Sequence, residues 1–530
     1  MTASAQSSVD PSLGALADAI LIPPFPGTTA PRWFLSALER GLAGVTYFGS
    51  NVVGDTAALS ASLRDAASVE PIIAIDEEGG DVTRVAYETG STYPGNLALG
   101  AVDDVALTSA VYAAIGTDLS RLGINVDLAP CADVLALDGS AVVGTRSFGA
   151  SPELVARHVA AAVTGLQSSG VMACAKHFPG HGSTIGDSHL ALATVRGTMD
   201  EIRARDLPPF LAAMAAGTVA IMPGHLVVPT LTGDMPASLS PAAVTGLLRG
   251  ELGFDGVVIS DGLEMKAASG VYGIPEASVL AVIAGVDLLC LGRDTDEAMY
   301  HAVRLAIAEA VTSGRLPGAR LEEAAARVNA LRARLAAARS DAASAAGDDG
   351  IGLVAARRAL RRSGPVPSSL VDPFIVEVEP EENMAAGRFA WGFDQWAHTE
   401  RIDPAAGDGA AASTILAAAV GRSLVLAVRD ARTAASLVAE VLAARPDAVI
   451  VEMGVPAWTP PEGTAYLATY GASRVCAQAA AEALGLALRP GTGRHRGRRG
   501  QGHSPPSAFH HDRESRREPP RGATNRSGDY

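Results

Sequence analysis

The chain has 530 residues, of which 48% are hydrophobic and 19% charged. This is a globular composition, and the chain is too long for one average domain. The formal net charge of −15 argues against nucleic acid or an anionic membrane as the partner of the whole protein. The cysteines form no Cys-x-x-Cys pair, so we expect reduced core residues at Cys131, Cys174, Cys290 and Cys476.

The first 27 residues lack a basic region and a cleavage site, and Pro23 and Pro24 interrupt their short apolar part. We therefore expect no signal peptide there. No run is expected to be long enough to span a membrane, so the default expectation is a cytoplasmic protein.

From about residue 13 to residue 335, short apolar runs alternate with amphipathic stretches. The predicted strands are residues 19–22, 43–48, 72–75, 124–128, 171–175, 219–222, 257–260 and 286–291. The predicted helices include residues 103–121, 152–168, 199–216, 241–251 and 294–313. This α/β alternation predicts a (β/α)8 TIM barrel within residues 1–340, and a doubly wound open sheet is the alternative. No Gly-x-Gly-x-x-Gly motif follows the first strand, which disfavours a dinucleotide-binding sheet.

The rest of the chain divides into three predicted segments. Residues 341–353 resemble a linker, and residues 354–490 predict a small α/β domain with only a few strands. Residues 491–530 have almost no aliphatic side chains and are predicted to be disordered. This basic tail is either a nucleic-acid-binding tail or the frame-shifted end of a GC-rich gene, and the second interpretation is preferred.

Polar side chains follow five of the predicted strands. They are Asp76, Glu77 and Glu78; Asp127 and Asp133; Lys176 and His177; His225; and Asp261. Because the carboxyl ends of parallel strands meet at one rim of a barrel, we expect these side chains to converge there.

The stretch from residue 173 to residue 195 combines a carboxylate and several imidazoles with glycines. Asp187 and His189 lie two positions apart, and a carboxylate that holds an imidazole produces a general acid/base near neutral pH. One alternative is a metal site formed by His177, His181, Asp187 and His189, although this spacing matches no common zinc motif. Another is a loop held together by its own hydrogen bonds.

Asp261, at the end of an apolar strand, predicts a nucleophile or an ionic stabiliser, with capping of the following helix as the alternative. The charged donors Arg84, Arg146, Lys176 and His177, with Asp76 nearby, are predicted to bind substrate oxygens. The alternative for each of them is a salt bridge at the rim.

Five stretches together resemble glycoside hydrolase family 3. They are AIDEEGGDVTR (74–84), VVGTRSFG (142–149), KHFPGHGSTIGDSH (176–189), MPGHLVVP (222–229) and VVISDGLEM (257–265). The likeness is strongest to the β-N-acetylglucosaminidase branch and covers about residues 13–335.

The resemblance implies a TIM barrel and a retaining mechanism without a metal or another cofactor. Asp261 would be the nucleophile, and His189, with Asp187 as its partner, would be the general acid/base. The residues that match the family's contacts to the terminal sugar are Asp76, Arg84, Arg146, Lys176 and His177. Many relatives carry an aspartate where this chain has Gly262.

The expected substrate is an oligosaccharide or muropeptide containing N-acetylglucosamine, cleaved exolytically from cell-wall fragments or chitin oligomers. Other expected activities are those of a β-glucosidase, a β-xylosidase or a phosphorylase that uses phosphate as acceptor. A metal-dependent barrel hydrolase and a non-catalytic sugar-binding protein also stay open. No nucleic-acid or membrane partner is expected.

Overall fold

The computed structural model describes residues 10–136, 143–185, 193–293, 295–341, 350–379, 387, 389–402 and 408–488. These residues belong to one compact unit that ends at Leu488. Two parallel or mostly parallel sheets organise it, one in each half of the sequence. The predicted tail, residues 491–530, lies outside the described residues, as does the 342–349 part of the predicted linker.

The first sheet follows the chain order. Its six hydrogen-bonded strands are β2 (Gly44–Thr46), β3 (Ile72–Ile75), β4 (Val126–Asp127), β5 (Met172–Phe178), β8 (Ala220–Pro223) and β10 (Val257–Val258). A separate parallel pair consists of β1 (Leu21–Ile22) and β11 (Leu289–Cys290), and a bridge between Ile259 and Leu288 joins this pair to the end of β10. The curled sheet has no reversal of strand order, which excludes the doubly wound alternative.

Helices alternate with these strands. Their bounds are α1 (Pro11–Asp18), α2 (Arg32–Glu39), α3 (Thr56–Ala66), α4 (Asn96–Val102), α5 (Val105–Arg121), α6 (Pro152–Ser168), α7 (Met199–Arg205), α8 (Leu207–Ala215), α9 (Pro229–Thr232), α10 (Lys266–Ala284), α11 (Glu297–Thr312) and α12 (Gly318–Asp341). Short helical turns are η1 (Gly49–Asn51), η2 (Gly144–Arg146) and η3 (Ala237–Leu239), and η4 (Ala242–Glu251) is a π-helix.

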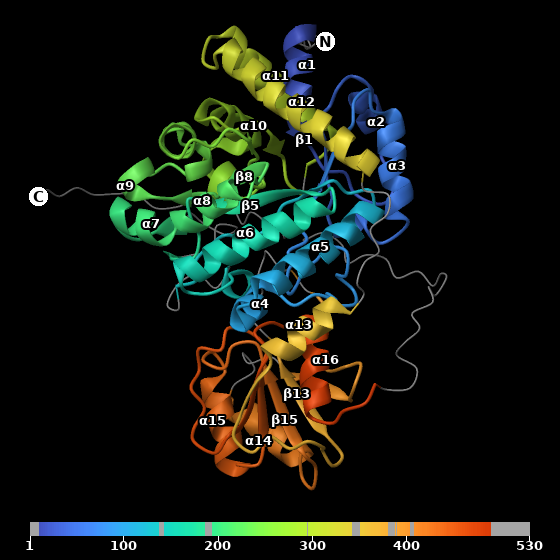
Figure 1. Cartoon of the computed structure of the whole chain (residues 1–530), viewed down its shortest axis with the longest axis vertical. Coiled ribbons are helices and arrows are strands. Elements are labelled where there is room, and N and C mark those ends of the chain that lie inside the picture. Colours follow the sequence, from blue (N-terminus) through green and yellow to red (C-terminus); the bar gives the residue numbers. More distant parts are fainter. Residues whose placement is uncertain are drawn as a thin grey trace, which may run out of the picture. The chain divides into compact units, whose positions relative to one another are not determined.

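Helices α5 and α6 show how the sequence specifies this packing. Asp104 caps α5, and Ser151 caps α6 just before Pro152 at its first position. The two helices lie side by side (Figure 1) because glycines let them approach closely. An ideal Cβ on Gly165 would lie 2.1 Å from the carbonyl oxygen of Ser109, so no larger side chain fits there.

Two predicted elements differ from the structure. Strand β5 runs through Phe178, so Lys176 and His177 belong to the strand and do not follow it. The single helix predicted over residues 199–216 is two helices, α7 and α8, which meet at Asp206 because prolines follow at the start of α8.

We expected no run long enough to span a membrane. Judged only by length and composition, this expectation is wrong for one helix among the described residues. Helix α10 is long and apolar enough to do so, although it contains a break at Gly273, where φ is 72°. Of its most apolar window, 44% is buried inside the molecule.

A small three-stranded sheet stands beside the rim of the first sheet. It consists of β6 (Thr184–Ile185), β7 (Ala193–Val195) and β9 (Leu226–Val227). Strands β6 and β7 are antiparallel partners, and residues 186–192 connect them. Strand β9 follows β8 and pairs in parallel with β7.

The second sheet has six strands, which is more than the sequence predicted. Their order is β12 (Arg361–Ser363), β17 (Ala465–Ala468), β16 (Val449–Glu452), β15 (Leu424–Val428), β13 (Phe374–Val378) and β14 (Thr399–Ile402), with β12 antiparallel. The helices of this second α/β domain are α13 (Ile351–Ala359), α14 (Asp408–Ala418), α15 (Ala435–Ala444) and α16 (Arg474–Ala483). The predicted boundary between the two domains stays a prediction.

Asp81, in the loop after β3, links the first sheet's rim to the second domain. Its Oδ2 accepts hydrogen bonds from Arg429 and, at 2.8 Å, from Thr145, and its Oδ1 accepts one from the amide of Ala472 at 2.9 Å. The Asp81 side chain is only 4% exposed, so its charge is compensated almost entirely by these donors. Next to it, Val82 packs within the hydrophobic core of the second domain.

Asp81→Ala is expected to lower the free energy of unfolding by about 3–5 kcal/mol, because it leaves the guanidinium of Arg429 buried without its carboxylate. The control is Arg358→Ala, which breaks an exposed pair with Asp104 and should cost less than about 1 kcal/mol. Urea unfolding measures both. Equal, small losses for the two variants would contradict a structural role for Asp81.

Candidate active site

Lys176 lies at the centre of the rim, at the carboxyl end of β5. Its Nζ contacts Asp76 Oδ1 at 2.6 Å and Glu78 Oε1 at 2.9 Å. Burial alone would lower the pKa of Lys176, but the carboxylates of Asp76 and Glu78 raise it above its usual value. Lys176 is therefore a fixed ammonium, and Asp76, with a side chain 21% exposed, is the member of this trio that faces solvent.

Glu78 is shared between two cations. Arg146 donates to it through Nε at 2.9 Å and Nη2 at 2.7 Å, a bidentate pair in which both side chains are buried. Burial acts to raise the pKa of Glu78, but Arg146 and Lys176 outweigh burial and hold it well below its usual range. Glu78 is one of the acids predicted at the rim, but only Asp76 was predicted to bind substrate, since adjacent acids look alike in a sequence.

Asp133, fully buried, orients the two histidines. Its Oδ2 contacts His177 Nδ1 at 2.8 Å, and its Oδ1 accepts the backbone amide of His181 at 2.7 Å. Burial acts to raise the pKa of Asp133, but His177 and His181 lower it, so it is a carboxylate. With Nδ1 donating to Asp133, Nε2 of His177 is left to accept from Arg146 Nη2 at 3.3 Å.

The residues that could hold a metal ion differ from the predicted ligands, of which only His177 belongs to the observed group. Among the described residues, the group whose ligand atoms lie within 4.8 Å of one another is Cys131, Asp133 and His177. These atoms already bond to one another, with Cys131 Sγ donating to Asp133 at 3.1 Å. Burial also raises the pKa of the Cys131 thiol, so this cluster fits a hydrogen-bonded hub better than a cation site.

Glu77 positions the loop that carries Arg84. Its Oε2 accepts the backbone amides of Arg84 at 2.8 Å and Val85 at 3.0 Å, and Asp127 Oδ1 accepts the amide of Glu77 at 3.0 Å. Burial raises the pKa of both Glu77 and Asp127. Asp127 is wholly buried, and its Oδ2 has no hydrogen-bond partner among the described residues.

Asp261 follows β10 and is partly exposed at the rim. Its Oδ1 accepts the amide of Gly262 at 2.7 Å. The helix-capping alternative is wrong, because the residue before α10 is Met265 and no side chain caps that helix.

Glu264 lies against the turn at Gly262. Its Oε2 is 2.5 Å from an ideal Cβ on Gly262, and its Oε1 accepts the amide of Arg293 at 2.8 Å. A side chain at position 262 would therefore have to displace the Glu264 carboxylate. This agrees with the presence of glycine here, where many relatives carry an aspartate.

The structure thus joins four predicted residues around Glu78: Lys176 and Arg146 contact Glu78 directly, Asp76 contacts Lys176, and His177 contacts Arg146. Arg84 is held by its backbone to Glu77, and Asp261 follows β10, which is separated from β5 by β8 in the same sheet. Asp187 and His189 lie outside the described residues, so their acid/base role stays a prediction.

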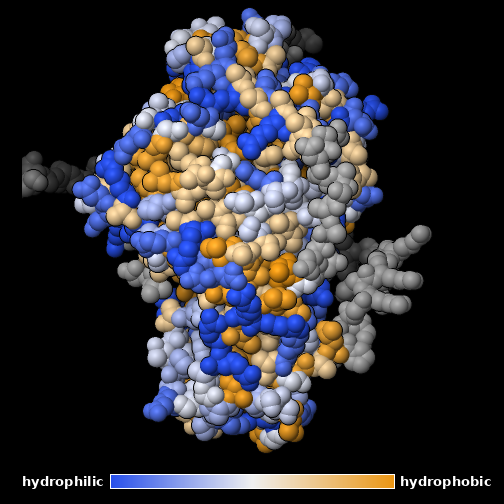
Figure 2. All heavy atoms as spheres, in the orientation of Figure 1, coloured by the Kyte–Doolittle hydropathy of each residue, from blue (hydrophilic) through white to orange (hydrophobic). Residues whose placement is uncertain are grey.

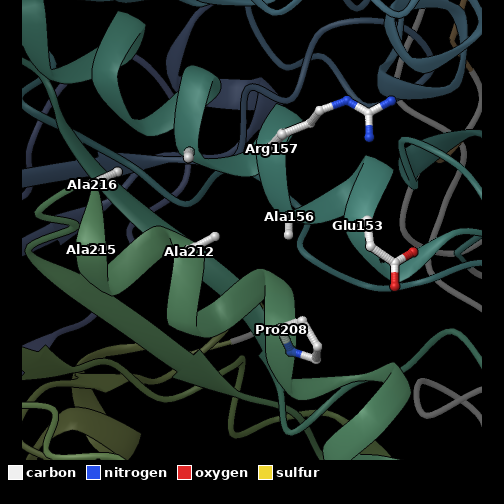
Figure 3. Close-up of a pocket in the computed structure, with 8 residues that line it drawn as sticks. Glu153, Ala156, Arg157, Pro208, Ala212, Ala215 and Ala216 are labelled. Atoms are coloured by element: carbon white, nitrogen blue, oxygen red, sulfur yellow. The ribbon is translucent and has the colours of Figure 1, made fainter.

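A groove elsewhere on the surface is unrelated to this site. It lies between α6 and α8 and is lined mainly by alanines, with Glu153 and Arg157 at its edge (Figure 3). In the space-filling view, apolar residues gather over these helices (Figure 2). No cluster of polar groups converges on the groove among its lining residues, so we assign it no chemistry.

The family follows from a direct sequence match. The sequence model of the glycosyl hydrolase family 3 N-terminal domain matches residues 38–331, which is more than half of the chain and includes all the described rim residues. The chain belongs to glycosyl hydrolase family 3, and it is a glycoside hydrolase.

Solved and curated relatives agree with this family. A family 3 β-N-acetylglucosaminidase from Paenibacillus sp. str. FPU-7 is 31% identical, with a TM-score of 0.79 over 90% of this chain and 97% of its own. A beta-hexosaminidase from Stenotrophomonas maltophilia is 37% identical over 51% of this chain and 84% of its own length. Beta-hexosaminidase A from Pseudoalteromonas piscicida is 32% identical over 58% of this chain, but the match spans only 56% of that relative.

His181 generates a prediction for pH. Burial, followed by the nearby His177, lowers the pKa of His181 to about 4. His181 therefore takes up a proton near pH 6.5 in the unfolded state, but only near pH 4 in the folded state. The free energy of unfolding thus falls as the pH drops from 6.5 to about 4. The shift corresponds to about 3 kcal/mol.

His181→Asn keeps a partner for Thr184, which contacts His181 Nδ1 at 2.6 Å, but cannot titrate. Urea unfolding at pH 7 and pH 4 should show a smaller loss of stability on acidification for this variant than for the wild type. Parallel curves for the two proteins would show that His181 carries no such proton linkage.

Proposed function

We propose that the protein is a retaining exo-β-N-acetylglucosaminidase that removes terminal non-reducing N-acetylglucosamine from cell-wall fragments or chitin oligosaccharides. The main support is the joined array around Lys176 at the end of β5, with Asp261 after β10 of the same sheet, because parallel-strand enzymes place their chemistry at the carboxyl ends of their strands. The names of the matched relatives support the choice of sugar. The proposal includes closure of the curled sheet as a (β/α)8 barrel and a cytoplasmic location.

In the first step of the proposed mechanism, an oxygen of the Asp261 carboxylate attacks the anomeric carbon. The bond from that carbon to the leaving oxygen breaks, and His189, oriented by Asp187, gives its proton to that oxygen. In the second step His189 takes a proton from water, whose oxygen attacks the anomeric carbon on the face that the leaving group left, opposite to Asp261, and the bond from that carbon to Asp261 breaks. Two inversions give net retention.

The array around Lys176 would bind the terminal sugar. Asp76 is a carboxylate acceptor held by Lys176, and the guanidinium of Arg146 is fixed by Glu78. Because these charged side chains are already paired, they lose little conformational freedom when a sugar hydroxyl binds. Such orientation of the binding groups lowers the barrier of the reaction. Arg84 and His177 are the remaining proposed sugar contacts.

The test is hydrolysis of nitrophenyl N-acetyl-β-glucosaminide, with proton NMR of the product formed first. We expect turnover, a β-configured first product and no loss of activity with a chelator. Asp261→Asn should lower kcat by about 10² or more, because an amide is a poor nucleophile. The matched control is Asp296→Asn, which changes an exposed carboxylate that caps α11 and should leave kcat within about twofold, since Asn caps equally well.

The other outcomes separate the competing functions. An α-configured first product would contradict retention, and sugar phosphate formed when phosphate is titrated in would make the enzyme a phosphorylase. Cleavage of the glucoside or xyloside alone would correct the sugar specificity. Loss of activity with chelator, restored by zinc, would favour a metal-dependent hydrolase, and sugar binding without turnover would favour a non-catalytic protein.

A further inference from the structure

We propose that His225 is a positioning residue that fixes the turn after the nucleophile, Asp261–Gly262, and through it the orientation of the Asp261 carboxylate. This inference rests on the proposed role of Asp261. His225 was predicted to follow a strand, and no role was assigned to it from the sequence.

His225 bridges two segments that are distant in sequence. It lies between β8 and β9 and is completely buried. Its Nε2 is 2.9 Å from the carbonyl oxygen of Gly262, and its Nδ1 is 2.6 Å from Ser238 Oγ in η3. Because a carbonyl oxygen can only accept, Nε2 must carry a hydrogen and donate it to Gly262. Ser238 holds the opposite side of the ring and so fixes its direction.

The turn at Gly262 is held on both sides. Its amide donates to Asp261 Oδ1 at 2.7 Å, and its carbonyl accepts from His225 and, at 3.1 Å, from the amide of Met265. The next amide, that of Leu263, donates to the carbonyl of Cys290 at 3.0 Å. The Asp261 carboxylate therefore bonds to the amide of Gly262, while His225 holds the next peptide group, between Gly262 and Leu263, on the other side of the same Cα.

The same segment also contacts the sugar-binding side of the site. An ideal Cβ on Gly224 would lie 3.0 Å from His177 Cβ, so the chain passes tightly against His177 just before His225. The carbonyl of Gly224 accepts the amide of Ser238 at 3.2 Å. One short segment thus sets the distance between a proposed sugar contact and the proposed nucleophile. A misplacement of about 1 Å at such a site can cost about 10² in rate.

The experiment compares two amides that differ by one methylene. In His225→Gln the side-chain amide reaches the Nε2 position and can still donate to Gly262. In His225→Asn it reaches only the Nδ1 position, beside Ser238. The exposed His301 of α11, 53% exposed, provides the control His301→Asn. The substrate is dinitrophenyl N-acetyl-β-glucosaminide, whose leaving group needs no proton, so its cleavage reports nucleophilic attack.

We expect His225→Asn to lower kcat by about 100-fold while KM stays within about threefold, because ground-state binding does not involve the turn. His225→Gln should recover at least about tenfold of that loss, and His301→Asn should match the wild type. The melting temperatures of the two His225 variants should agree closely. Wild-type kcat in His225→Asn, equal kcat in the Asn and Gln variants, or a loss that follows melting temperature would overturn the proposal.

Two further measurements keep the result decisive. If His225→Asn does not fold, Ser238→Ala should lower kcat by about three- to tenfold at unchanged KM, and an unchanged kcat would count against the proposal. Amide hydrogen exchange over residues 259–265 gives a readout that needs no activity. Exchange should be faster in the Asn variant and restored in the Gln variant, even if the wild type cleaves none of the substrates and the proposed function itself fails.

Discussion

The carboxylate of Glu78, buried between the ammonium of Lys176 and the guanidinium of Arg146, is the interaction on which the rest of the rim depends. Each of these three charges would be costly to bury alone, and together they compensate one another. The arrangement holds Lys176 against Asp76 and Arg146 against His177 without using solvent as a partner. The charged groups of the site are thus already in place before any sugar binds. The free energy needed to bury them is offset by other interactions of the fold.

The same loop after β3 also connects the site to the second domain. Asp81, three residues beyond Glu78, accepts hydrogen bonds from Thr145, the neighbour of Arg146, and from Arg429 and Ala472 of the second domain. Both segments that carry the buried ion pair are therefore anchored to the second sheet. The second domain stabilises the geometry of the rim, although the proposed reacting groups all come from the first half of the chain.

The sequence predicted the strands of the first sheet well because each is a short apolar run ending in polar residues. It was less successful where a strand continues through charged residues, as β5 does through Lys176 and His177, since charge normally marks the end of a buried strand. It also expected too few strands in the second domain, where β12 and β14 carry exposed polar side chains.

Within the site, the residues proposed to contact substrate were easier to predict than those that orient them. Asp76, Lys176, Arg146 and His177 stood out by charge and by their motifs, and the structure joins them. The roles of Glu78, Asp133 and His225 depend on contacts between residues far apart in the sequence, which no local pattern encodes. The burial of Asp127 could not be predicted either, because a strand-end aspartate looks the same in a sequence whether it is exposed or buried.

The most direct test of this account is to trap the proposed glycosyl-enzyme. A 5-fluoro-N-acetylglucosaminyl fluoride should transfer its sugar to the enzyme faster than water releases it, and peptide mass spectrometry then locates the adduct. The account predicts a single added 5-fluoro-N-acetylglucosaminyl group on the peptide that contains Asp261, with the anomeric fluoride released. An adduct on a different residue, or continued turnover of the fluoride with no adduct on any peptide, would contradict Asp261 as the nucleophile.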